Sequence, residues 1–202
     1  MLHGIDISKH NGDAEELIKD AGFVIIRAGF GKNNIDPEFK KNVALCKKYN
    51  KPYGVYWFSY ATSEALAYNE ALFTYNSFKD LDYKPTLPIF IDWESDSEKY
   101  LRKCGKRFTW DFYNKVITTY CRCLEDHGCY AGVYCDYYHY KHLGTKNFLV
   151  WLAKWDGVAN FNKYSDEIWI KQYKVDKIKN VDINVLKDEK LIDCIITKGF
   201  NK

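Results

Sequence analysis

The sequence has 202 residues, of which 47% are hydrophobic and 28% charged, which is enough chain to bury one well-formed core. Its formal net charge is only +3 and the lysines are scattered, which excludes the basic stripe of a nucleic-acid surface. No apolar run approaches the roughly 20 residues that cross a bilayer, so we expect no membrane insertion.

The beginning of the chain and its cysteines exclude further classes of protein. Residues Met1–Asp6 lack a basic stretch followed by an apolar one, so we expect no secretion signal. The seven cysteines form no C-x-x-C pair and no Cys/His cluster with zinc spacing, and their odd number argues against a complete disulfide framework. We expect no metal site and interpret the cysteines as small buried hydrophobes or free thiols. They are Cys46, Cys104, Cys121, Cys123, Cys129, Cys135 and Cys194.

Strand-like and helix-like segments alternate along the chain. Continuous β-branched runs such as Phe23–Arg27 predict buried strands. Helix starts are indicated by the capping-box-like Asp13–Glu16, by Pro37 at a first helical position and by Thr109. The predicted helices cover residues 13–22, 36–46, 62–78 and 109–128, and the predicted strands cover residues 4–7, 23–27, 53–60, 87–93, 130–134, 148–153, 167–173 and 181–185.

The order of these segments predicts an α/β fold. Repeated strand, helix and strand imply parallel pairing, and eight strands predict a closed barrel. The strands after residue 148 follow each other with little room for helices. We therefore expect an irregular TIM-like β/α barrel with missing helices in its last third. No linker or repeat divides residues 1–202, which predicts a single domain.

Four acidic residues are predicted to meet at one mouth of this barrel, where loops after the strand ends build active sites. Alternation along the fourth strand places Asp92 and Glu94 on the inward face. Asp6 ends the first strand on its inward face, and Asp182 lies in the eighth strand, which neighbours the first in a closed barrel. We expect Asp6 and Asp182 together, across the mouth from the other two.

Such carboxylates can hold a hard cation, act on a glycosidic bond, or pair with basic residues in a core. Aromatic side chains favour the sugar chemistry, because a metal site needs no ring-lined groove. Arg27, at the end of the second strand, is interpreted either as a counter-ion of the acids or as a substrate ligand. The rings expected around the mouth are Tyr56, Phe58, Tyr60 and Tyr134, with Trp151 and Trp155 flanking the end of the sixth strand.

An ordered set of short motifs makes the sequence recognisable. The motifs are Asp6–Gly12, Phe23–Gly29, Gly54–Ala61, Ile91–Glu94, Gly132–Tyr134, Trp151–Ala153, Ile170–Tyr173 and Val181–Asp182. In this order they resemble the Chalaropsis-type lysozymes, glycoside hydrolase family 25, over nearly the whole chain. One departure is Trp57, where many relatives carry a histidine, and alternation points it away from Tyr56 and Phe58.

The resemblance implies a barrel with missing helices, bacterial cell-wall peptidoglycan as substrate, and a catalytic set of Asp6, Asp92, Glu94 and Asp182. It adds Gln172 to the expected substrate-binding residues. We expect a muramidase that cleaves the β-1,4 bond between N-acetylmuramic acid and N-acetylglucosamine, with Glu94 as general acid. Asp92 stays ionised and either orients and polarises the 2-acetamido group or stabilises the oxocarbenium-like transition state. Asp6 and Asp182 hold the sugar or a water on the far side. These steps require no cofactor.

Two other functions stay open on the sequence. A chitinase-like hydrolase also ends its fourth strand in Asp-x-Glu, but Leu87 and Phe90 replace the further aspartates of that pattern. A non-catalytic glycan-binding barrel would keep the groove without turnover. For the muramidase we expect a monomer that acts on the bacterial wall, either secreted or released from the cytoplasm as a phage lysin. Residues 1–202 are then the catalytic domain, with no wall-binding domain.

Overall fold

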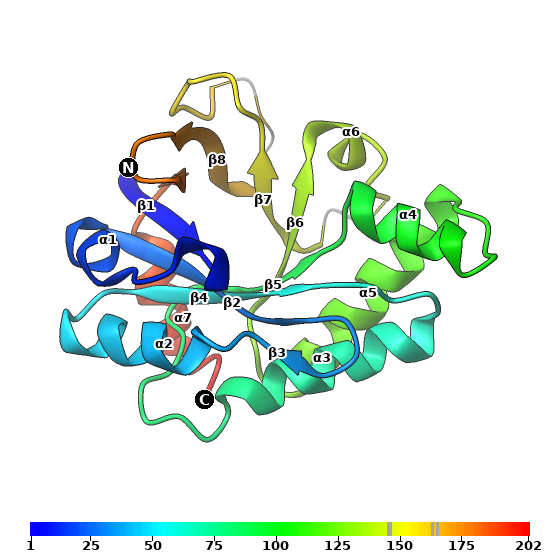
Figure 1. Cartoon of the computed structure of the whole chain (residues 1–202), viewed down its shortest axis with the longest axis horizontal. Coiled ribbons are helices and arrows are strands. Elements are labelled where there is room, and N and C mark those ends of the chain that lie inside the picture. Colours follow the sequence, from blue (N-terminus) through cyan, green and yellow to red (C-terminus); the bar gives the residue numbers. More distant parts are fainter. Residues whose placement is uncertain (145–146, 163, 165) are drawn as a thin grey trace.

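Eight strands close into a barrel in the computed structural model, which describes residues 1–144, 147–162, 164 and 166–202 (Figure 1). Around the barrel the order is β1, β2, β4, β5, β6, β7, β8 and β9, with β9 paired back to β1. A two-residue strand, β3, adds to the edge of β2. The bounds are β1 Leu2–Ile7, β2 Phe23–Phe30, β3 Asn34–Ile35, β4 Tyr53–Phe58, β5 Ile89–Asp92, β6 Ala131–Asp136, β7 Leu149–Ala153, β8 Ile168–Asp176 and β9 Val181–Leu186. The predicted barrel is confirmed.

The last strand runs opposite to the expected direction. β1, β2 and β4 to β8 pair in parallel, whereas β9 is antiparallel to both β8 and β1. The prediction of parallel pairing throughout was wrong here because residues 177–180 are too few for a crossover, which needs a dozen or more. Asn180 sits in the left-handed region (φ 48°) that such a tight turn requires. Because β9 is reversed, its first residues lie at the mouth where the other strands end.

Helices cover the outer face of the barrel beside its first strands. The four predicted ones are α1 (Glu15–Asp20), α2 (Phe39–Lys48), α3 (Glu64–Phe78) and α5 (Trp110–Asp126). Four further short elements were not predicted, namely η1 (Lys9–Asn11), α4 (Ser95–Lys103), α6 (Tyr137–Tyr140) and α7 (Lys190–Lys198). No helix lies between β7 and β9 among the described residues, as the helix-poor last third had indicated.

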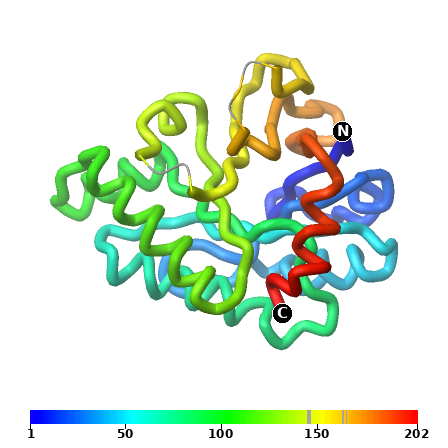
Figure 2. Tube along the Cα trace, turned by 180° about the vertical axis from the view of Figure 1, so that it is seen from behind, coloured from blue at the N-terminus to red at the C-terminus, as the bar shows by residue number. Residues whose placement is uncertain are grey.

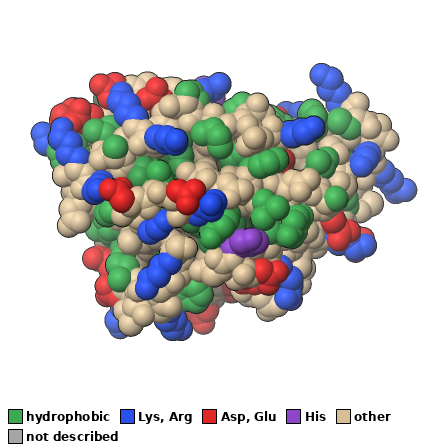
Figure 3. All heavy atoms as spheres, turned by 90° about the horizontal axis from the view of Figure 1, so that it is seen from below, with side chains coloured by type: hydrophobic (Ala, Val, Ile, Leu, Met, Phe, Trp, Pro, Cys, Tyr) green, Lys and Arg blue, Asp and Glu red, His purple; other side chains and the backbone are tan. Residues whose placement is uncertain are grey.

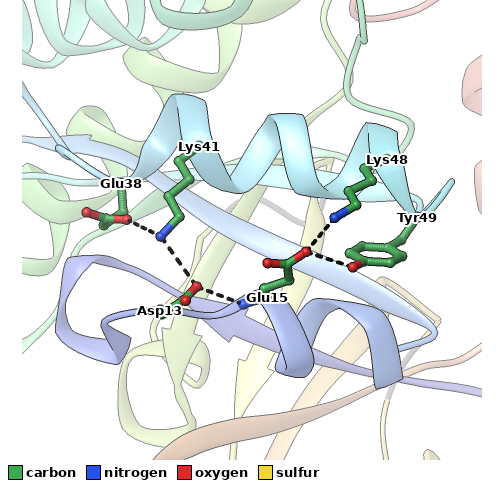
Figure 4. Close-up of polar contacts among 6 residues, drawn as sticks. All are labelled: Asp13, Glu15, Glu38, Lys41, Lys48 and Tyr49. Carbon is green, nitrogen blue, oxygen red and sulfur yellow. Dashed lines mark hydrogen bonds and ion pairs between the residues drawn. The ribbon is translucent and has the colours of Figure 1, made fainter.

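Salt bridges tie α1 to α2 on the outside of the barrel (Figure 4). Glu15 accepts hydrogen bonds from Lys48 Nζ and the Tyr49 hydroxyl, both at 2.7 Å. Lys41 reaches Asp13 at 3.3 Å. Glu15 and Tyr49 are partly exposed and the other side chains lie largely in solvent, where water and salt screen the ion pairs and leave each a small contribution to stability. They orient the two helices and have no part in the mouth of the barrel.

Two apolar clusters lie on either side of the sheet. The outer cluster packs helices against outward residues such as Ile89 and Ile91, and the inner one contains Phe90 and Trp151. This alternation along β5 is the one predicted from the sequence. Leu191 of α7 belongs to the inner cluster, so the last helix closes the barrel at the end opposite the mouth (Figure 2, red).

The surface carries no large charged patch on the face shown in Figure 3, where basic and acidic side chains are interspersed.

All seven cysteines are free, and five of them are buried, as the sequence had indicated. Within the described residues, no helix combines the length and the apolar character that a membrane span requires.

Candidate active site

A cleft of about 340 Å³ opens at the mouth of the barrel. All the predicted site residues except Tyr60 and Trp155 line it. The predicted residues in its wall are Asp6, Arg27, Tyr56, Phe58, Asp92, Glu94, Tyr134, Gln172 and Asp182, and Trp151 lies beneath them. Among the described residues, no group of three or more histidines, cysteines or acids is arranged to hold a metal ion.

Asp92 ends β5 at the bottom of the cleft. Its side chain is 5% exposed, and its Oδ1 atom is buried without a hydrogen-bond partner in the protein. Burial raises the pKa of Asp92 well above its ordinary value, and the negative charges of Glu94 and Asp6 add to this effect. Burial therefore opposes ionisation of Asp92 in the free cleft, and its ionised state in the enzyme–substrate complex stays a prediction.

Glu94 stands at the start of α4, two residues after Asp92 on the same inward face. Its backbone N–H donates to Ser97 Oγ at 3.2 Å, which fixes the turn from strand to helix. Burial raises the pKa of the Glu94 carboxyl, and the charges of Asp136 and Asp96 raise it further. These effects shift the Glu94 carboxyl toward its protonated form at the edge of an open cleft.

Asp6 and Asp182 are register partners on β1 and β9, as predicted. Asp6 Oδ2 accepts hydrogen bonds from Asn184 Nδ2 at 2.7 Å and from Gln172 Nε2 at 2.9 Å. Burial raises the pKa of Asp6 to about 7, and the charge of Asp182 contributes, while the two amides lower it. Burial also raises the pKa of Asp182.

Gln172 connects the floor of the cleft with its rim. Besides donating to Asp6, it accepts hydrogen bonds at Oε1 from Tyr134 Oη at 3.1 Å and from Trp155 Nε1 at 2.7 Å. Trp155 is 61% exposed and stands outside the cleft wall. Its ring therefore borders the opening without lining the chemical centre.

Arg27 pairs with a residue that the sequence had not indicated. Its Nε donates to Asp36 Oδ2 at 2.7 Å, and the same oxygen accepts the backbone N–H of Lys9 at 3.1 Å. Asp36 is buried, so the carboxylate that pairs with Arg27 is not one of the four predicted acids. Whether Arg27 also contacts the substrate stays a prediction. Arg27 Nη2 is buried and has no hydrogen-bond partner in the protein.

Three site residues escaped prediction. Asn184 follows Asp182 by two positions on β9, so the same alternation would have placed it inward beside Asp6. Asp136 follows Tyr134 by two positions on β6 and caps α6 through the His139 N–H at 2.8 Å. The sequence indicates Asp36 only as the beginning of a helix, and its contact with Arg27 forms in the folded structure.

Solved structures of an endolysin, an autolysin and a family 25 glycosyl hydrolase resemble this fold. The CTP1L endolysin is 22% identical with a TM-score of 0.76, over 96% of this chain and 70% of that one. The autolysin LytC from Streptococcus pneumoniae is 24% identical with a TM-score of 0.74, over 91% of this chain and 46% of that one. A family 25 glycosyl hydrolase from Bacillus anthracis is 21% identical with a TM-score of 0.72, over 100% and 94%. No curated protein matches the sequence.

The family itself is shown by a sequence model, that of glycosyl hydrolases family 25, which matches residues 5–185. That range begins one residue before Asp6 and ends just after Asn184, so it contains every residue of the carboxylate cluster. The chain belongs to glycosyl hydrolases family 25 and is a glycoside hydrolase.

Proposed function

We propose that the enzyme hydrolyses bacterial cell-wall peptidoglycan, at the β-1,4 bond that follows N-acetylmuramic acid. Similar folds belong to an endolysin and to an autolysin, and the autolysin has also been solved with a synthetic peptidoglycan ligand. The observation that carries the proposal is the pair Asp92 and Glu94, two carboxyls with raised pKa values at one strand end inside a ring-lined cleft.

Glu94 is the proposed general acid. Its raised pKa favours the protonated carboxyl, and its position at the cleft edge leaves that proton accessible to a glycosidic oxygen. As the bond between the anomeric carbon and this oxygen breaks, the proton moves from Glu94 to the leaving sugar. Glu94 is then a carboxylate and can take a proton from the water that completes hydrolysis.

Asp92 is proposed to act on the 2-acetamido group of the substrate. Its Oδ1 has no partner in the free cleft, so it is available to accept a hydrogen bond from the acetamide N–H. The acetamide carbonyl oxygen then bonds to the anomeric carbon from the face opposite the leaving group. An ionised Asp92 stabilises the positive charge of this cyclic intermediate, and water opens it with net retention.

Asp6 and Asp182 form the opposite wall. The amides of Asn184 and Gln172 hold Asp6 in place, so this carboxyl is oriented before a substrate arrives. We assign the two aspartates to holding the sugar or the attacking water. The pKa of Asp6, about 7, suits a group that exchanges protons with water near neutral pH, and burial raises the pKa of Asp182 as well.

The test is a turbidity assay on purified bacterial walls followed by borohydride reduction of the products. Clearing with muramitol ends is expected. Glucosaminitol ends would contradict the assigned bond, and hydrolysis of chitin in place of walls would favour a chitinase. Binding to walls without clearing would indicate a non-catalytic glycan-binding barrel.

A further inference from the structure

A row of aromatic rings leads out of the cleft along the ends of β4 and α4. Phe58 lines the cleft, and its ring centroid lies 5.1 Å from that of Tyr60. Tyr60 in turn lies 4.9 Å from Tyr100, which is 43% exposed on α4. The rings thus form a continuous path from the carboxylates to the outer surface.

The backbone of Tyr60, the middle residue of the row, is held by polar contacts to a buried side chain. The backbone N–H of Tyr60 donates to Glu70 Oε1 at 3.0 Å, and the Glu70 carboxylate also accepts from the Ser59 hydroxyl. Glu70 is 4% exposed on α3. On the other side of the ring, a Cβ at Gly31 would come within 3.1 Å of Tyr60 Cδ2, so the absence of a side chain there leaves room for it. The backbone of Tyr60 is therefore fixed beside the cleft, and its ring packs between those of Phe58 and Tyr100.

The charges around the outer ring are neutralised by near neighbours on α4. Lys99 reaches Asp96 at 2.7 Å, and Arg102 reaches Glu98 at 2.6 Å. Each acid has a basic partner within one helical turn, so the charges beside Tyr100 largely cancel. Tyr100 therefore presents an exposed apolar ring with a polar hydroxyl group. Such a surface suits an uncharged sugar ring better than the carboxylates of a stem peptide.

A polymeric substrate has to extend beyond the cleft. Its volume of about 340 Å³ is at the lower end for sites that enclose one small ligand. A glycan strand held over Asp92 and Glu94 must therefore leave the cleft over its rim. The ring row is continuous with the cleft wall and offers the strand a surface on which its sugar faces can stack.

We propose that Tyr60 and Tyr100 form an outer subsite that binds a sugar ring of the glycan strand beyond the cleft. This inference rests on the proposed function and names where the strand leaves the site. The subsite contributes binding of long strands and takes no part in bond cleavage.

The experiment compares kcat/KM on long glycan strands with kcat/KM on tetrasaccharide fragments of the same wall. Tyr100→Ala is expected to lower the ratio of the two values by roughly three- to tenfold, the range of one aromatic contact. Tyr100→Phe keeps the ring and should retain most of the ratio. Tyr68→Ala removes a tyrosine that is 44% exposed on α3 and serves as the matched control, with an unchanged ratio.

An unchanged ratio in Tyr100→Ala, with wild-type enzyme cleaving both substrates, would overturn the subsite alone. The same loss in Tyr68→Ala would also overturn it, because the effect would not depend on the ring row. If wild-type enzyme cleaves neither substrate, the proposed function fails and the subsite fails with it. Thermal melting of each variant separates a lost contact from a lost fold.

Discussion

Asp6 on β1 and Asp182 on β9 face one another across the antiparallel strand pair that closes the barrel. Their pairing depends on the reversal of β9, which brings the beginning of that strand to the mouth where β1 ends. Burial raises the pKa values of both aspartates, and the charge of Asp182 adds to the shift of Asp6. Closing the barrel thus creates a carboxylate pair whose ionisation opposes folding.

The first prediction follows from this opposition. The pKa of Asp6 is about 7 in the folded protein, above its unfolded value, so the folded state binds the proton more tightly. Stability contributed by that proton is present below pH 4 and is lost as the pH rises through about 7. Asp6→Asn should therefore be more stable than wild type at pH 8, on the order of a few kcal/mol, and should lose this advantage at pH 4.

Urea unfolding of both proteins across this pH range measures the effect. The matched control is Asp176→Asn, a partly exposed aspartate whose pKa is lowered by backbone N–H groups, foremost that of Lys179. It should gain nothing at pH 8. A stability difference for Asp6→Asn that does not vary with pH would contradict the raised pKa.

The second prediction concerns the general acid. Glu94→Gln keeps the volume and a hydrogen-bonding head but removes the proton donor, so turnover should fall by ~10²–10⁴-fold. The melting temperature should stay level or rise, because a buried acid with a raised pKa is replaced by a neutral group. Glu64→Gln, at an exposed position that begins α3, is the control and should keep full activity. Activity of Glu94→Gln within a few-fold of wild type would move the acid elsewhere.

The third prediction concerns Asp136, whose negative charge is the largest charge contribution to the raised pKa of Glu94. Asp136→Asn should lower that pKa, so the alkaline limb of the kcat/KM profile should shift to lower pH. The Asn side chain can still accept the His139 N–H that caps α6, which preserves the local structure. Asp111→Asn, at an exposed position on α5, should leave the profile unchanged. A profile that does not move in Asp136→Asn would remove this residue from the tuning of Glu94.

Much of this arrangement was predictable because successive side chains along a strand point to opposite faces of the sheet. Alternation put Asp6, Asp92 and Glu94 on the inward face, and closure of the barrel joined Asp6 with Asp182. The direction of β9 was not predicted, since the expectation of parallel strands rested on helices that its short connection cannot contain.

Other features depended on contacts that a local pattern does not encode. The buried ion pair of Arg27 with Asp36 joins two segments only after folding, through a loop next to β3. The helix α4 buries only Ser97 and Leu101, so it shows too few apolar positions for a periodic signal. The contact of Tyr100, on α4, with Tyr60 was therefore not predicted.

The fourth prediction tests the cysteines. Cys104 is exposed and should react with a thiol reagent in the native protein, whereas the five buried cysteines should react only after denaturation. Burial raises the pKa of Cys46 to about 12, which adds to its protection. Without a reductant, denatured protein should titrate all seven thiols. A total of one titratable thiol in the denatured protein would indicate disulfides. In the native protein, Cys104→Ser should remove the fast-reacting thiol.

The last prediction separates substrate assistance from direct attack by a protein carboxylate. Asp92 and Glu94 lie two residues apart at one strand end, so neither is placed beneath the sugar as a nucleophile opposite the other, at the ~5–5.5 Å of a retaining pair. The acetamide carbonyl can occupy that position only if the muramic residue keeps its acetyl group. Walls de-N-acetylated at that sugar should therefore bind the cleft yet resist cleavage, and NMR of the first product from intact walls should show the retained anomer. Equal rates on both walls would contradict assistance by the acetamide, and an inverted first product would favour a water activated by Asp6 or Asp182.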